Sequence, residues 1–273
     1  MLTDEELSQL TDVARQCRRD IVRMTNKAGS GHPAGSLSAI DALVVLYLHH
    51  LRVRPEEPDW RERDQFFLSK GHCTPAYYAA MAARGFFPRE ELMTFRALPT
   101  RLQGHPSNTH LPGVDSSSGS LGQGLSVANG AAIAAKHDGL DSRYYVMIGD
   151  GESQEGQIWE AAMTASDRGL DNVCALIDAN GIQLDGTVDS VKSLGDQGAK
   201  WRAFGWEVIE IDGHDLRAID DALTRAAGTR GAPTAIIACT VKGKGVSFME
   251  NTAKYHGLAP TDAELRIALE ELR

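Results

Sequence analysis

The stretch from residue 144 to residue 151 reads YYVMIGDG, an apolar run that ends in an acidic residue between two glycines. A short, continuous apolar run bounded by glycine predicts a buried β-strand, here Tyr144–Ile148. Similar runs predict further strands at Val173–Ile177, Trp206–Ile211 and Thr234–Cys239. Helical segments separate these strands. The pattern therefore predicts an α/β fold with a mostly parallel sheet flanked by helices.

Apolar residues at helical spacing predict the helices around this sheet. Thr3 and Glu6 form a capping-box pattern, so a first helix is expected from there to about Asn26. A second, more buried helix is expected over Ser38–Leu51, after a glycine loop, Ala28–Gly35. Later helices are expected at residues 125–136, 158–168, 197–204 and 216–226. Because there is no internal repeat or long linker, residues 1–273 are expected to form a single domain.

The composition excludes several classes of partner. A net charge of −9 and a pI near 5.5 leave no basic surface for nucleic acid or for anionic membranes. No apolar run approaches the roughly 20 residues of a membrane span, and the acidic N-terminus does not resemble a signal peptide. The four cysteines are scattered without a CxxC pair. These features predict a soluble protein of a reducing cytoplasm.

Polar residues directly follow two of the predicted strands. Asp150 lies between Gly149 and Gly151, and Asn180 lies in the run Asp178–Ile182. Parallel sheets bind ligands at the carboxyl ends of their strands, and neighbouring strands would bring Asn180 beside Asp150. A carboxylate, an amide and a backbone carbonyl are hard oxygen ligands that suit Mg²⁺. Either motif alone is more often a turn, but their joint placement predicts a site for a metal-bound phosphate.

Glycine and histidine give two further signals. Residues 119–124, GSLGQG, open a predicted helix, so their backbone N–H groups could face an anion or a flat heterocycle. No strand directly precedes this loop, which argues against a nicotinamide-binding fingerprint. Histidines in loops with glycine or proline suggest phosphate binding or proton transfer; they are His32, His72, His105 and His256. The remaining histidines receive no role; they are His49, His50, His110, His137 and His214.

Seven segments taken together resemble the N-terminal, diphosphate-binding domain of transketolases. In chain order they are residues 30–33, 63–72, 104–106, 119–124, 149–156, 178–182 and 242–257. The match is collinear and covers nearly the whole chain. Two positions depart from the usual pattern, since Ala179 stands where the thiamine-diphosphate motif often has asparagine, and Ala34 stands where transketolases usually have glycine.

The resemblance implies roles for the matching residues. The implied ligands of Mg²⁺, or of Ca²⁺ or Mn²⁺ in its place, are Asp150, Asn180 and the carbonyl of Ile182. The implied contacts of thiamine diphosphate are His72, Gly119, Ser120, Leu121, Gly149, Asp150, Gly151, Asn180, Ile182 and His256. The residues implied in catalysis are His32, His72, His105, His256 and Glu155. In that resemblance the histidines assist proton transfer at the sugar, and Glu155 links two active sites across a dimer.

The activity implied by the resemblance is transfer of a two-carbon ketol unit from a ketose, commonly phosphorylated, to an aldose. Transketolases are more than twice as long, and their second domain holds the glutamate that acts on the cofactor's aminopyrimidine. We therefore expect a split transketolase that needs a C-terminal subunit with the pyrimidine-binding domain, in a heterotetramer built on two-fold symmetry.

Two alternatives remain open at this point. One is a subunit of another thiamine-diphosphate enzyme, such as a 2-oxo acid dehydrogenase or a deoxyxylulose-phosphate synthase relative. The other is a non-catalytic protein that binds the cofactor or a partner. The loops Gly31-His32-Pro33 and Gly104-His105-Pro106 favour ketol transfer over the other enzymes. The set of Asp150, Asn180 and the histidines argues against a remnant without chemistry.

Overall fold

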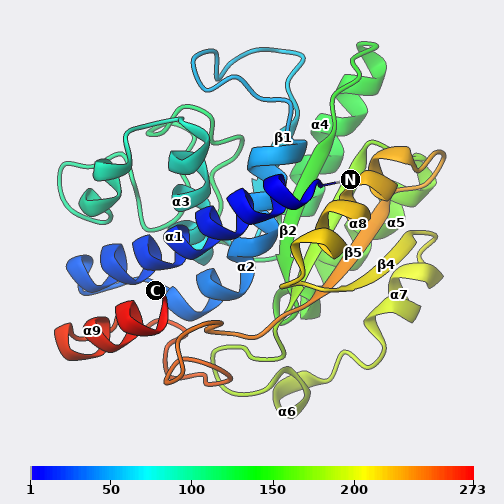
Figure 1. The fold of residues 1–273 in the computed structure, drawn as a ribbon. Helices are drawn as coiled ribbons and strands as arrows, with labels where there is room; N and C mark the ends of the chain where they lie inside the picture. Colours follow the sequence, from blue (N-terminus) through cyan, green and yellow to red (C-terminus); the bar gives the residue numbers. More distant parts are fainter. Residues whose placement is uncertain (1) are drawn as a thin grey trace.

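The computed structural model describes residues 2–273, and a five-stranded sheet forms its centre (Figure 1). The strands are β1 (Gln65–Leu68), β2 (Tyr144–Gly149), β3 (Val173–Ala179), β4 (Glu207–Asp212) and β5 (Thr234–Cys239). They lie in the order β1-β2-β3-β5-β4, and each neighbouring pair is parallel. The predicted α/β fold is thus confirmed, and the carboxyl ends of all five strands share one edge.

Helices cover both faces of the sheet. The first face is covered by α1 (Asp4–Ala28), α2 (Pro33–Val45), α3 (Thr74–Arg84) and α8 (Leu216–Gly228). The second face is covered by α4 (Gly124–His137), α5 (Gly156–Asp167) and α7 (Gln197–Ala203). The short α6 (Val188–Lys192) follows β3, and the C-terminal α9 (Asp262–Glu271) packs against α1.

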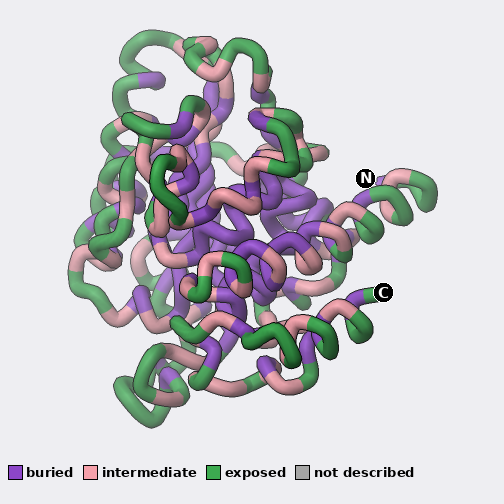
Figure 2. Tube along the Cα trace, turned by 90° about the vertical axis from the view of Figure 1, so that its left-hand side faces the viewer, coloured by how far each residue is buried: buried purple, intermediate pink, exposed green. Residues whose placement is uncertain are grey.

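The alternation of side chains along β2 explains the two cores. Tyr145 and Met147 point into the core shared with the first group of helices, whereas Val146 and Ile148 point into the second. Successive residues of a strand face opposite sides, so a strand that is apolar throughout must be covered on both faces. The buried residues accordingly form a continuous centre in the burial view, with exposed positions confined to the outside (Figure 2).

The sequence-based predictions missed strand β1 and helices α3, α6 and α9, and they misplaced one helix. Strand β1 is only four residues long, too short for its pattern to be separated from a loop. The expected loop Ala28–Gly35 and helix Ser38–Leu51 are wrong in their bounds, because α2 already begins at Pro33. Proline is favoured in the first turn of a helix, where its missing N–H has no partner to lose.

Helix α2 is buried at each of its 13 positions, which explains its apolar residues on every side. At its N-terminus lies His32, and at its C-terminus the backbone widens into a π-helical turn, Leu46–His50. The helix therefore runs from the edge of the sheet that holds the carboxyl ends of the strands to the opposite end of the fold. Among residues 2–273, no helix is both long enough and apolar enough to cross a membrane.

Candidate active site

The loops that follow β2 and β3 bring the predicted metal ligands together. Gly149, the last residue of β2, pairs with Asp178 of β3, so the two loops leave the sheet side by side. The Asp150 carboxylate accepts hydrogen bonds from the backbone N–H of Gly151 at 2.7 Å and from that of Gly181 at 2.5 Å. The predicted proximity of the Asp150 loop and the Asn180 loop is therefore confirmed.

Asp150 lies in an environment that disfavours its charge. The side chain is buried, and burial together with the nearby Asp178 carboxylate raises the pKa of Asp150 to about 6. The hydrogen bonds that Asp150 accepts from backbone N–H groups lower its pKa and so offset part of this rise. A carboxylate held in this way is stabilised by a cation, because a positive charge nearby favours the ionised form.

Asn180 and Ile182 supply the two other predicted donors. The Asn180 amide donates to Asp178 at 2.9 Å, and its Oδ1 accepts from the backbone N–H of Ile182 at 3.1 Å. The carbonyl of Ile182 accepts from the amine of Lys242 at 2.8 Å. Together with Asp150, these groups give one carboxylate, one amide and one carbonyl oxygen on adjacent loops. That set of donors fits a hard divalent cation such as Mg²⁺.

A buried ion pair lies directly beneath these donors. The amine of Lys70, after β1, bonds the carboxylate of Asp178, and each side chain is 2% exposed. Burial works against the charged form of Lys70, but the carboxylate outweighs it and the pKa of Lys70 lies above its usual value. The pKa of Asp178 is lowered, because Lys70 overcomes the effect of burial. Both groups are therefore charged at neutral pH.

The predicted metal ligands line a cavity of about 240 Å³ at the edge of the sheet where the strands have their carboxyl ends. The predicted site residues that line it are His72, Leu121, Gly149, Asp150, Gly151, Glu155, Asn180, Ile182 and His256. His32 stands beside the cavity, with its ring centroid 5.1 Å from that of His72 and 5.6 Å from that of His256. Three histidines that lie far apart in the sequence thus form one cluster.

Burial keeps these histidines neutral at physiological pH. Burial and then Arg96 lower the pKa of His32 to about 4, and burial and then Lys242 lower the pKa of His256 to about 3. Burial also holds the pKa of His72 well below its usual value. The buried Nδ1 of His32 has no hydrogen-bond partner within the described residues. The cluster therefore offers neutral imidazoles, each with an unprotonated nitrogen that can accept a hydrogen bond.

Other predicted residues lie at the rim. His105 is exposed, and its ring lies against Gly119. A Cβ atom on residue 119 would lie 3.3 Å from Cδ2 of His105, so the ring occupies space that a larger residue would need. Burial and Arg96 lower the pKa of His105.

Ser120 does not line the main cavity but a neighbouring one of about 290 Å³. Glu155 is exposed and lines the main cavity, with its side chain against Gly122. The φ angle of Gly122 is +83°, which residues other than glycine rarely adopt.

Lys242 is a residue of the site to which the sequence analysis gave no role. Its side chain is buried in the cavity wall, and its amine lies 2.9 Å from Nδ1 of His256 as well as bonding Ile182. Burial and the neighbouring Lys70 lower the pKa of Lys242 to about 8. The only signal in the sequence was a lysine in a glycine-rich segment, which more often marks a solvated loop.

Glu152 is a second such residue, and it holds the loops together. One carboxylate oxygen accepts from Ser69 and, at 2.8 Å, from the backbone N–H of Gly122, while the other accepts from that of Gly149 at 2.9 Å. The side chain is 3% exposed, and burial raises the pKa of Glu152. This carboxylate joins the ends of β1 and β2 to the glycine loop that precedes α4.

The fold and the site define a class of protein: a parallel α/β domain whose strand ends surround a cavity lined by oxygen donors, lysines and histidines. The family described as "Transketolase, thiamine diphosphate binding domain" matches residues 8–272. The chain belongs to this family, and so to the transketolase family of transferases.

Similar proteins agree with this assignment. The 6-deoxy-6-sulfo-D-fructose transketolase subunit SqwG of Clostridium sp. (strain MSTE9) is 42% identical over 98% of this chain and 98% of its own length. An apulose-4-phosphate transketolase subunit of Phocaeicola vulgatus is 42% identical over 93% of this chain and 90% of its own. The transketolase structure from Leishmania mexicana superposes with a TM-score of 0.91 at 30% identity. It covers 96% of this chain, which spans 41% of that protein.

We expect Glu152→Gln to destabilise the chain by about 1–3 kcal/mol. The amide would present an N–H₂ group to a buried N–H donor, which leaves a polar group without a partner. Equilibrium urea unfolding followed by circular dichroism measures the change. Glu160→Gln, at an exposed position of α5, is the matched control and should change the stability by less than roughly 0.5 kcal/mol. An equal effect of both substitutions would contradict the role given to Glu152.

The lowered pKa of His32 predicts a pH-dependent stability. In the unfolded chain His32 binds a proton below its usual pKa of about 6.5, whereas in the folded chain it binds the proton only below about pH 4. The free energy of unfolding therefore falls as the pH is lowered through this range. His32→Asn removes this contribution, so the variant should lose less stability than the parent between pH 7 and pH 5. Urea unfolding without added metal or cofactor measures both, with exposed His137→Asn as control. Identical pH profiles for the parent and His32→Asn would contradict the prediction.

Proposed function

We propose that this chain is the diphosphate-binding subunit of a two-chain transketolase, formed by a single domain over residues 1–273. It would transfer a two-carbon ketol group from a ketose, commonly a phosphate, to an aldose, with thiamine diphosphate and Mg²⁺. The observation that carries the proposal is the convergence of Asp150, Asn180 and the Ile182 carbonyl on a cavity walled by two buried lysines and neutral histidines.

The charges around the cavity support diphosphate binding. Asp150 and the oxygens of Asn180 and Ile182 would hold the metal ion, and Lys70 and Lys242 provide positive charge for phosphate oxygens. The lysines are buried, where an electrostatic interaction is stronger than in water. Lys242 bonds the Ile182 carbonyl, so its amine lies beside one of the groups that would hold the metal ion and could also contact a phosphate oxygen.

The histidines support proton transfer at the substrate. Thiamine diphosphate, when bound, supplies the electron sink for breaking and forming carbon–carbon bonds. His32 and His256 would accept or return a proton on the sugar hydroxyl, since both are neutral and their rings are 5.6 Å apart. His105, at the exposed rim, would contact the sugar's hydroxyl groups. Gly119 and Leu121 would contact the cofactor ring, and Glu155 would connect two active sites.

The similar proteins support a second, partner chain. Two relatives that this chain matches over 90% or more of their length carry the word subunit in their names. The chain spans less than half of the solved transketolase. The missing part would be a separate C-terminal chain with the pyrimidine-binding domain and its glutamate, joined in a heterotetramer of two copies of each chain. We place this assembly in the cytoplasm.

Asp150→Asn should weaken magnesium-dependent binding of thiamine diphosphate on the order of 100-fold, since it removes the only charged ligand of the metal. Isothermal titration calorimetry with thiamine diphosphate at fixed Mg²⁺ measures this, and circular dichroism checks that the variant is folded. Asp185→Asn changes an exposed carboxylate in the adjacent loop and should leave the affinity within about twofold. Unchanged binding by Asp150→Asn would exclude the proposed metal site.

The purified chain should bind thiamine diphosphate and Mg²⁺ but show no turnover with a ketose phosphate donor and an aldose acceptor. Turnover should appear when a chain that carries the pyrimidine-binding domain is added, because that chain supplies the glutamate for the aminopyrimidine. Pyruvate in place of the ketose is the control for a 2-oxo acid enzyme. Full ketol transfer by the isolated chain would refute the two-chain proposal.

A further inference from the structure

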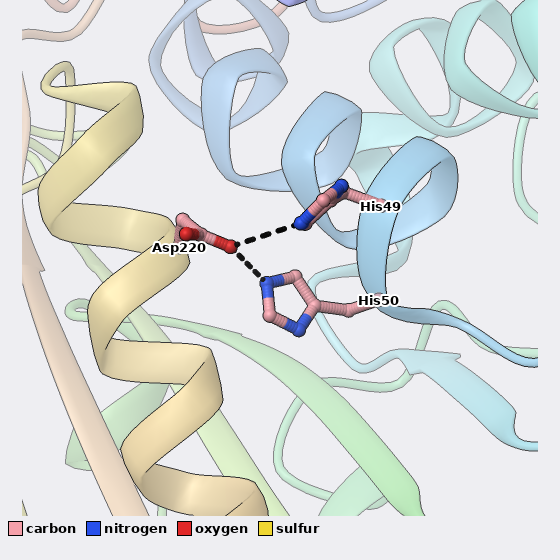
Figure 3. A group of neighbouring side chains, drawn as sticks. All are labelled: His49, His50 and Asp220. Carbon is pink, nitrogen blue, oxygen red and sulfur yellow. Dashed lines mark hydrogen bonds and ion pairs between the residues drawn. The ribbon is translucent and has the colours of Figure 1, made fainter. Parts of the chain in front are cut away.

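Two histidines without a role in the proposed reaction meet one buried carboxylate at the far end of α2. His49 and His50 end the π-helical turn, and Asp220 lies in the middle of α8 (Figure 3). Both rings point toward the carboxylate from the same side. The ligand atoms of the three residues lie within 4.8 Å of one another, and this is the only such group of three among residues 2–273.

The distances between the three side chains are close to those in a small coordination site. Nε2 of His49 lies 3.5 Å from Oδ1 of Asp220, and Nε2 of His50 lies 2.8 Å from the same oxygen. Zinc binds nitrogen and oxygen ligands at about 2.0–2.2 Å, so neighbouring ligands in a tetrahedral site are separated by about 3.4 Å. The first distance already fits, and the second must lengthen by less than about 1 Å.

The backbone prepares this geometry. The N–H of Leu51 donates to the carbonyl of Leu46 at 2.8 Å, an i to i+5 bond that widens the last turn. In an α-helix, successive side chains diverge by about 100°. The wider turn reduces this angle and lets two consecutive histidines face one carboxylate. Short π-helical segments occur frequently at functional sites.

The carboxylate is fixed by a second contact. Oδ2 of Asp220 accepts from the backbone N–H of Leu2 at 3.0 Å, which directs Oδ1 toward the histidines. The Asp220 side chain is 1% exposed, that of His50 11% and that of His49 30%. Contacts that orient a ligand in this way raise metal affinity. The exposed side of His49 leaves a path for an ion from solvent.

We propose that His49, His50 and Asp220 bind a divalent transition-metal ion of the zinc class. Two imidazoles and one carboxylate are typical ligands of zinc, and a water molecule would complete four-coordination. The ion would join the N-terminal segment, the end of α2 and the middle of α8, which lie far apart in the sequence. The ion would lie outside the proposed active site, because the 13 residues of α2 separate it from His32 by roughly 20 Å.

The test uses the whole chain, stripped of metal and then saturated with Mg²⁺ and thiamine diphosphate so that the Asp150 site is filled. Calorimetric titration should detect one Zn²⁺ per chain, and its binding should raise the Tm by roughly 5 °C at 100 times the Kd. Co²⁺ at the same site should give the intense visible absorption bands of a tetrahedral ion.

His49→Ala and His50→Gln should each lower the Zn²⁺ affinity on the order of 100-fold and weaken the Co²⁺ bands. His49 is partly exposed, so its removal should leave the fold intact, as circular dichroism would show. His137→Gln, which changes an exposed histidine at the end of α4, should bind Zn²⁺ like the parent. The proposal is overturned if no Zn²⁺ binds beyond the filled Asp150 site, or if both histidine variants bind it unchanged.

Discussion

The buried ion pair of Lys70 and Asp178 is the interaction on which the site depends. Asp178 also accepts hydrogen bonds from Ser38 of α2, from Thr240 after β5 and from the Asn180 amide. One carboxylate thus joins α2 to the ends of three strands. Loss of one partner from a buried ion pair costs about 3–5 kcal/mol, because the remaining charge is uncompensated. The loops that carry the metal donors are held by this contact.

Burial sets the charges of the cavity as a whole. It keeps the three clustered histidines neutral, brings the pKa of Lys242 to about 8 and raises that of Asp150 to about 6. An anionic phosphate with a divalent cation would reverse these effects at the lysine and the carboxylate, because each would gain an opposite charge nearby. The charges of the proposed ligand would therefore complement those of the site, and the neutral imidazoles remain available as hydrogen-bond acceptors.

Helix α2 gives the molecule two polar ends separated by buried, mostly apolar residues. Its N-terminus places His32 at the cavity, while the π-helical turn at its other end places His49 and His50 against Asp220. A helix buried on every side cannot shift easily, since protein interiors are closely packed. The two clusters therefore occupy fixed positions at opposite ends of the same rigid element.

The sequence by itself determined the local features: β2, β3 and β5, the turn motifs after the first two, and the adjacency of the Asp150 and Asn180 loops. The strands and turns follow from apolar periodicity, which acts over a few residues, and the adjacency of the two loops follows from the parallel pairing of consecutive strands that are separated by one helix. Only the tertiary structure decided the contacts of Lys242 and Glu152 and the meeting of the two histidines with Asp220. Those contacts join residues far apart along the chain, and sequence spacing carries no information about which distant surfaces pack together.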